Sequence, residues 1–501
     1  MMTAQVPYQN AANQNTLNHY AVPRRFLVTL KLGEMPEKIP SMVACRHFGV
    51  HPANRLDGGP FDRILRHHGG STRICRLHNS RTKAAQRPGV IGARRFDEAE
   101  QLSGVARVLL IQTQNDVHAR QLMEAVAQIP IVEKVQADRI CIAPFYSEPV
   151  FERTPETDAS NSITETDEAQ AWQSRLLTQL PQALGFEPGD PSVVVGLADT
   201  GIMANHRALT ANIRRGFDTV DLKPSMVGDL QLVGDNRSFD ELPFDEVGHG
   251  TGCAGILQAS GGLLPPGGAG RCGLTPVRVL GAGLSAQKRI GIGALSNIDA
   301  GMKRLIDLNV KVVNMSFGTA KSSLSQFSPL PHEEVVKYAL SRDVILVAAS
   351  GNSGIEEAYY PAAHEGVIAV GAVDNHANPC AFSTRGNHVD LCAPGKKVWT
   401  TGMNGYQQVT GTSFAAPFVA GVCALMAAHA ARRALPLNAS IAADILRQSA
   451  RPFASANVEG YGSGVVDALA ALQLLSQTLD SHHYLDGQNS MLDQSNLEMT
   501  G

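Results

Sequence analysis

Short aliphatic runs alternate with longer stretches of helical character through the second half of the chain. Val193–Ala198 is a continuous aliphatic run, which is typical of a parallel strand buried on both faces. The alternation predicts an α/β domain with a mainly parallel sheet covered by helices on both faces. The other predicted strands are Val277–Leu280, Val310–Met315, Val344–Ala348 and Val367–Val373, and the predicted helices are Gly250–Ala259, Ile290–Leu308, Glu333–Ser341, Phe418–Ala431, Ile441–Arg447 and one that begins at Asp467.

The first third of the chain predicts a smaller α+β unit. Residues 33–95 are rich in Gly, Pro, Arg and His and show little periodicity, so no element is assigned there. Around this stretch, strands and one helix follow each other in close succession. The predicted elements are the strand Arg25–Lys31, the strand Ala106–Gln112, the helix Asn115–Gln128 and one or two strands in Ile131–Ala143.

Composition divides the chain into five parts. Residues 1–22 are polar and predict a disordered lead, and residues 477–501 predict a flexible tail. Glu148–Glu168 carries Pro, Thr, Ser, Asp and Glu with few aliphatic residues, which is the composition of an exposed linker. We therefore predict an α+β domain in 23–145, a linker and candidate processing region in 146–188, and the large α/β domain in 189–476.

Charge and cysteine content narrow the classes of function. The chain has 501 residues and a formal net charge of −3, so its net charge gives no electrostatic argument for binding to nucleic acid or to an anionic membrane surface. No secretory signal begins the sequence and no run reaches the roughly 18 apolar residues of a membrane span, which favours a cytoplasmic location. The eight cysteines include no C-x-x-C pair, which favours free thiols, although the even count also allows disulfides.

Ser413 stands near the start of the long apolar helix predicted in Phe418–Ala431. We expect Pro417 within the first turn or so, where a missing N–H costs least. The unpaired N–H groups and the positive dipole end at a helix N-terminus stabilise an oxyanion that develops nearby. Taken alone, however, a serine at this position predicts only a helix cap.

Three more polar residues lie beside predicted strand ends or helix starts. Asp199 and Asn352 each follow an aliphatic strand, and His249 stands between two glycines before a helix. The carboxyl ends of parallel strands line the crevice where open α/β sheets place their sites. Alone, each of these residues predicts a turn or a loop.

Together the four residues supply the parts of a nucleophilic hydrolase. A serine hydroxyl attacks a carbonyl poorly unless a base takes its proton, and histidine suits that task. An aspartate holds the imidazole in one tautomer and stabilises its charged form. A side-chain amide can donate to the oxygen that becomes negative in the tetrahedral intermediate.

The motifs around these residues closely resemble those of subtilisin-like serine proteases, or subtilases, whose triad follows the same order of Asp, His and Ser. The resemblance implies a subtilisin-like three-layer fold and a serine endopeptidase that forms an acyl-enzyme. It implies Asp199, His249 and Ser413 as the triad, with Asn352 and the Ser413 backbone N–H as the oxyanion hole. The matching segments are Asp199–Gly201, His249–Thr251, Asn314–Gly318, Gly351–Gly354, Gly411–Pro417 and Tyr461–Ala468.

The same resemblance implies how an extended peptide or protein substrate binds. An edge segment pairs with the substrate as an added strand, and a second segment forms a wall of the pocket for the residue before the scissile bond. Tyr359 or Tyr360 is implied as the floor of that pocket. The implied substrate-binding residues are Ser316, Phe317 and Gly318 in the edge segment and Ala349, Ser350 and Gly351 in the wall.

The N-terminal unit resembles the propeptide of the family, with Val132–Asp138 as its closing strand. This resemblance implies an autoinhibited precursor, or zymogen, in which the chain's own N-terminal domain is an intramolecular inhibitor. Cleavage is then expected in the linker, within residues 145–170. The acidic residues between Asp229 and Glu246 predict a solvated loop, with a cation site as the alternative.

Two departures from the family pattern affect the expected ligands. Cys253 shares a helix face with His249, which resembles the cysteine-bearing branches of the family and predicts a packed thiol. Gly261–Gly270 replaces the segment that holds calcium in many relatives and has no side-chain oxygens. We therefore expect no metal and no cofactor. Two alternatives stay open, a catalytically silent binding module and a serine esterase or acyl transferase, although the G-x-S-x-G cue of α/β-hydrolases is missing at Ser413.

Overall fold

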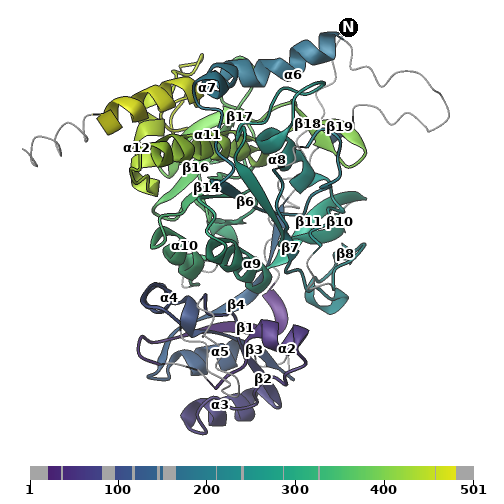
Figure 1. Cartoon of the computed structure of the whole chain (residues 1–501). Helices are drawn as coiled ribbons and strands as arrows, with labels where there is room; N and C mark the ends of the chain where they lie inside the picture. Colours follow the sequence, from purple (N-terminus) through teal and green to yellow (C-terminus); the bar gives the residue numbers. More distant parts are fainter. Residues whose placement is uncertain are drawn as a thin grey trace, which may run out of the picture.

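The computed structural model consists of a small N-terminal unit packed against one end of a larger α/β unit (Figure 1). The N-terminal unit is drawn in purple and blue at the bottom of Figure 1, and most of the larger unit in teal to yellow above it. Residues 1–20 of the predicted lead and 481–501 of the predicted tail fall outside the described residues, whereas 21–22 belong to a strand and 477–480 to a helix, so the predicted lead and tail were too long at these positions. The structure describes residues 21–480 except 35, 37, 82–95, 115–118, 144–146, 150–164, 210–211, 238–241, 286, 325–327 and 457.

A seven-stranded sheet in the order β17-β16-β14-β12-β6-β9-β7 forms the centre of the larger unit. Each of its strand pairs is parallel, as the alternating pattern predicts. Since parallel strands all end at one edge, residues that follow several of these strands come together there. The strands are β6 Val194–Asp199, β7 Phe217–Asp218, β9 Gly273–Arg278, β12 Val312–Met315, β14 Ile345–Ala349, β16 Val367–Val373 and β17 Val389–Pro394.

Helices cover both faces of this sheet, and the alternation of side chains along β6 shows why. Val195 and Leu197 lie in one hydrophobic cluster with α8, α11 and α12, whereas Val194 and Ala198 lie in a second cluster with α9 and α10. The helices are α8 His249–Gln258, α9 Leu295–Asp307, α10 Glu333–Leu340, α11 Thr412–Arg432 and α12 Ala439–Ser449, and residues 468–480 are also helical.

The central helix α11 is apolar on all sides because it is buried on all sides. Its most apolar 18-residue window has a mean hydropathy of 1.7, and 94% of that window is buried inside the protein. By length and composition α11 could cross a membrane, so the expectation that no segment reaches that composition was too strict. A buried core helix of a soluble domain passes the same test.

The N-terminal unit is an α+β unit with the antiparallel strand order β2-β3-β1-β4. Helices α3 and α5 bury their apolar residues against this sheet in one cluster. The sequence left α2, α3 and β2 unassigned because residues 33–95 lack a clear period. The elements are β1 Ala21–Leu30, α2 Met42–His47, α3 Pro60–Gly69, β2 Thr72–Arg76, α4 Glu98–Ser103, β3 Val108–Thr113, α5 Ala119–Ala127 and β4 Val132–Ala143.

The strand β4 extends from the N-terminal unit into the larger unit. Its last residues pair antiparallel with β11 (Lys288–Ala294), which forms a hairpin with β10 (Gly281–Ser285), and β8 (Gln231–Leu232) pairs with β10. The prediction of one helix from Ile290 to Leu308 was therefore wrong for its first five residues. Gly293 explains the difference, because a Cβ there would lie 2.6 Å from the Val279 carbonyl oxygen, and glycine permits the close approach.

Charged and polar side chains fix the N-terminal unit to the starts of α9 and α10. Asp138 is completely buried and accepts a hydrogen bond of 3.0 Å from the Ser296 N–H in the first turn of α9. Lys134 pairs with Glu334 of α10 at 2.7 Å, and Thr29 donates to Glu334 at 2.7 Å. An acidic side chain at a helix N-terminus is favoured by the helix dipole, so Asp138 stabilises this docking.

The region predicted as a linker contains two helices. The first, α6 (Glu165–Leu177), ends before Gln179, whose φ of 53° is left-handed, and the second, α7 (Leu180–Phe186), begins next to it. Trp399 packs with α6 of this region in a small cluster. Remaining short strands are β5 Ser147–Pro149, β13 Thr319–Ala320, β15 Tyr359–Tyr360, β18 Val398–Gly402 and β19 Gly405–Val409.

Candidate active site

Asp199 and His249 form a buried hydrogen-bonded pair at the carboxyl edge of the parallel sheet. Asp199 is the last residue of β6, and His249 is the first residue of α8. His249 Nδ1 lies 2.6 Å from Asp199 Oδ1, and both side chains are completely buried. The second neighbour of this carboxylate oxygen is the Thr200 N–H, at 2.7 Å. The carboxylate therefore fixes the orientation of the imidazole ring.

Asp245 holds the loop that precedes His249, a role that the sequence did not reveal. One carboxylate oxygen accepts from the N–H groups of Val247 and Gly248, both at 2.9 Å, and from Thr200 Oγ1 at 2.8 Å. The other oxygen accepts from the Thr251 N–H at 2.8 Å and from its hydroxyl at 2.6 Å. Burial raises the pKa of Asp245 although these donors act against it. The expectation of a solvated loop was thus wrong at Asp245, which is completely buried.

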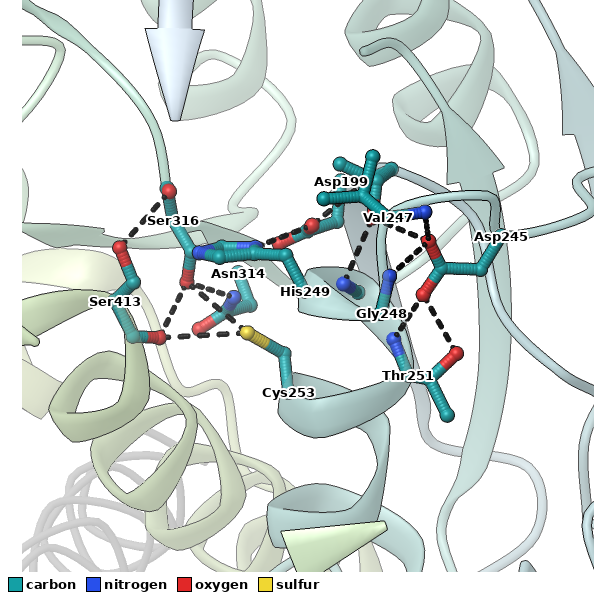
Figure 2. Close-up of polar contacts among 12 residues, drawn as sticks. Asp199, Asp245, Val247, Gly248, His249, Thr251, Cys253, Asn314, Ser316 and Ser413 are labelled. Carbon is teal, nitrogen blue, oxygen red and sulfur yellow. Dashed lines mark hydrogen bonds and ion pairs between the residues drawn. The ribbon is translucent and has the colours of Figure 1, made fainter. Parts of the chain in front are cut away.

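Ser413 is the second residue of α11, where the first N–H groups of the helix have no partner within the helix. Its hydroxyl donates to the main-chain oxygen of Ser316 at 3.2 Å. Figure 2 shows the His249 ring lying between Asp199 and Ser413. The structure therefore brings the three predicted triad residues to one edge of the sheet, with the serine proton directed at a carbonyl.

Pro417 is the sixth residue of α11, in its second turn. A proline at this position removes the helical hydrogen bond to the carbonyl four residues earlier, which is that of Ser413. Ser316 Oγ donates to this carbonyl instead, at 2.7 Å, and Asn314 Nδ2 donates to Ser316 Oγ at 2.9 Å. The helical hydrogen bond that Pro417 removes is thus replaced by one that joins the Ser413 main chain to the segment that follows β12 (Figure 2).

Asn352 lies beside the start of α11, as a donor to an oxyanion near Ser413 requires. Its side-chain oxygen accepts from the Thr412 N–H at 2.9 Å and from the Thr412 hydroxyl at 3.0 Å. Thr412 Oγ1 also lies 3.2 Å from the Gly351 N–H. Because these bonds engage the oxygen end of the amide, the NH₂ end is the donor that the side chain offers to a ligand.

The predicted substrate-binding segments follow β12 and β14. Gly318 forms an isolated antiparallel bridge with Ile142 of β4, so the N-terminal unit occupies the edge predicted for a substrate. In the second segment the Ser350 hydroxyl donates to the Thr384 carbonyl oxygen at 3.0 Å. A Cβ on Gly351 would lie 3.1 Å from the Tyr359 ring, so the Tyr359 ring lies against this wall. The remaining predicted members of these segments, Ser316, Phe317 and Ala349, are buried.

The Cys253 thiol lies one helical turn after His249 and is completely buried. It donates to the Ser413 carbonyl oxygen at 3.4 Å, and burial, followed by the charge of Asp199, raises the pKa of Cys253 well above its ordinary value. Asp199, His249 and Cys253 have potential ligand atoms within 4.8 Å of one another. Asp199 already binds the imidazole, so this group is explained by the Asp–His pair without a metal. All eight cysteines are free thiols.

Comparison with known proteins identifies the class of protein that this fold and site define. The model of the subtilase family (Peptidase S8) matches residues 190–464, which is more than half of the chain. The chain therefore belongs to the subtilase family. This result confirms the predicted resemblance and the predicted subtilisin-like α/β fold.

Among individual proteins, the chain is similar to thermitase from Thermoactinomyces vulgaris, with 32% identity over 292 residues, covering 56% of this chain and 92% of thermitase. It is 36% identical over 284 residues to subtilisin BL from Lederbergia lenta, covering 56% of this chain and 90% of that protein. A protease structure from Pseudoalteromonas arctica aligns with a TM-score of 0.51 and 26% identity over 61% of this chain and 97% of that structure. The protein is a subtilisin-like serine endopeptidase, whose substrates are peptides or proteins.

Proposed function

We propose that this chain cleaves peptide bonds through Asp199, His249 and Ser413. Ser413 Oγ attacks the carbonyl carbon of the scissile bond, and His249 takes the hydroxyl proton. His249 then gives this proton to the departing amine as the C–N bond breaks, and a water molecule hydrolyses the acyl-enzyme by the same steps. Asp199 supports the charged imidazole throughout. The buried hydrogen bond of 2.6 Å between Asp199 and His249, beside Ser413, carries this proposal.

The oxyanion of the tetrahedral intermediate has two proposed donors. One is the Ser413 backbone N–H in the first turn of α11, and the other is the Asn352 amide. Both are held in place before a substrate arrives, since Asn352 is bonded to Thr412 through its oxygen. Donors that are fixed in advance stabilise developing charge without reorganisation, which is their main contribution to the rate.

The N-terminal unit is proposed to be an intramolecular inhibitor that makes the chain a zymogen. On one side of Ser413, β4 pairs with β11 and bridges to Gly318. On the other side, β5 pairs with β19, with Ser147 opposite Val409, four residues before Ser413 in sequence. The chain therefore approaches the candidate nucleophile as an extended strand and leaves it as another. We propose self-cleavage between Ala143 and Ser147, at the N-terminal limit of the linker that the sequence indicated.

A pair of proteins tests these proposals. The full-length chain and its Ser413→Ala variant are purified side by side, and intact mass is measured over time. We expect the parent to release a fragment that ends between residues 143 and 147, and the variant to keep its full mass. Cleavage of both proteins at one rate would mean that another protease cuts the chain.

Fluorophosphonate labelling separates an enzyme from a silent binding module. We expect the parent to gain one adduct on Ser413 and to hydrolyse casein, whereas Ser413→Ala does neither. A cleaved parent that takes no label and hydrolyses no peptide would overturn the catalytic proposal. An adduct on Ser413 with ester hydrolysis but no peptide hydrolysis would favour the esterase alternative.

A further inference from the structure

A second buried Asp–His pair joins α9 to the start of α10. His332 is the residue before α10, and its Nδ1 lies 2.5 Å from Asp299 Oδ1 in α9. The imidazole is completely buried, and Asp299 is 5% exposed. Burial works against the charged ring, but the Asp299 carboxylate outweighs it and raises the pKa of His332 to about 10. At neutral pH both ring nitrogens are therefore hydrogen-bond donors.

The His332 ring lies beside β4 of the N-terminal unit. Among the described residues, His332 Nε2 has no hydrogen-bond partner although it is buried. The thiol of Cys141 in β4 is close enough to contribute to the raised pKa of His332. Cys141 Sγ lies 3.5 Å from Thr319 Oγ1. An imidazole and a hydroxyl of the larger unit thus surround one small side chain of the strand that crosses the groove.

The register of β4 shows which substrate residue would take the place of Cys141. Cys141 is opposite Gly293 in β11, and the next residue of β4 bridges to Gly318 on the other side. In an antiparallel pairing, the substrate residue two positions later lies opposite Ser316, whose carbonyl accepts from the Ser413 hydroxyl. The carbonyl of that substrate residue is then the one that Ser413 attacks. The place of Cys141 is therefore the fourth residue before the scissile bond.

We propose, on the basis of the function proposed above, that His332 and Thr319 select substrates with a small hydrogen-bonding side chain, a hydroxyl or a thiol, at the fourth residue before the scissile bond. An aliphatic side chain there would leave the buried Nε2–H of His332 without an acceptor. A site built to hydrogen-bond a substrate group rejects an analogue that lacks it. Glu334 adds negative charge beside Asp299, which disfavours a carboxylate in the same place.

Two peptides that differ only by a hydroxyl in place of a methyl group provide the first test. Threonine and valine have nearly the same shape, so two otherwise identical substrates carry Thr or Val at the fourth residue before the scissile bond. With the amount of enzyme set by fluorophosphonate adduct on Ser413, we expect kcat/KM to be about tenfold higher for Thr. Equal values for Thr and Val would overturn the inference but not the proposed protease. No adduct and no hydrolysis of either peptide would count against the protease itself.

Two variants then connect the preference to the pair. His332→Asn tolerates the left-handed backbone at this position, where φ is 67°, and Asp299→Asn removes the charge that keeps the ring protonated. In both variants we expect the Thr/Val ratio to fall toward one, because the charged imidazole that distinguishes the two side chains is lost. An unchanged ratio in His332→Asn would overturn the assignment. If neither variant folds, the parent's own Thr/Val ratio still decides the inference.

Discussion

Two buried Asp–His pairs in this molecule have nearly the same geometry and different surroundings. Their Nδ1–Oδ1 distances are 2.6 Å for Asp199–His249 and 2.5 Å for Asp299–His332. The first pair lies beside a serine at the N-terminus of a helix, whereas the second lies beside the thiol of a docked strand. A carboxylate-bound imidazole therefore does not by itself define a catalytic base. The group at the second ring nitrogen decides what the pair can do.

Replacing the carboxylate of each pair should give the largest difference in kcat between the two pairs. We expect Asp199→Asn to lower kcat by about 10⁴, because the imidazole loses the partner that fixes its tautomer and supports its charge. We expect Asp299→Asn to lower kcat less than about threefold on a substrate with Val at the fourth residue before the scissile bond, because no reacting atom touches this pair. Steady-state kinetics of both variants check this, and comparable losses in kcat would contradict the different roles proposed for the two pairs.

The first pair is also supported by a buried carboxylate, that of Asp245, in the loop before His249. Asp245 ties the loop before His249 through five hydrogen bonds to Thr200, Val247, Gly248 and Thr251. We expect Asp245→Asn to reduce kcat by about 10- to 100-fold, since its NH₂ group meets donors where the carboxylate accepted, and the imidazole shifts.

A positioning role for Asp245 makes a prediction that simple loss of folded protein does not. The rate constant for fluorophosphonate labelling of Ser413 should fall with kcat, whereas KM should change little. Glu246→Gln is the matched control, because the adjacent carboxylate pairs with Arg278 at 2.7 Å and accepts from the Asp235 N–H at 2.9 Å. A normal labelling rate in Asp245→Asn, or equal losses in Glu246→Gln, would remove Asp245 from the support of the site.

The sequence revealed the first pair and not the second for physical reasons. Asp199 and His249 carry local signals, since Asp199 ends an aliphatic strand, His249 stands between two glycines at a helix start, and the surrounding motifs resemble a known family. His332 has no such neighbours, and its contact with Asp299 arises only when α9 and α10 pack side by side. The strand β11 was missed for a related reason: its glycines weaken the strand pattern, and their purpose becomes visible only when the Val279 backbone lies against Gly293.

The smallest expected difference between the pairs concerns stability. His332 has a pKa of about 10 in the folded protein against 6.5 for the free side chain. Below pH 6.5 both states hold the proton, so the pair contributes fully. Between pH 6.5 and 10 the unfolded state loses the proton first, so this contribution falls as pH rises.

The difference in stability with and without Asp299→Asn separates this contribution from those of other groups that titrate in the same pH range. In a Ser413→Ala background, which prevents self-cleavage, the urea midpoint is measured at pH 6.5, 8 and 10 with and without Asp299→Asn. The variant should be less stable at pH 6.5, because its buried ring must give up its proton on folding, and the gap should narrow steadily toward pH 10. A gap that stays constant across this range would mean that the folded ring is not protonated at neutral pH. His332 would then have an acceptor nitrogen as well as a donor, and the preference for a substrate hydroxyl would no longer follow from its charge.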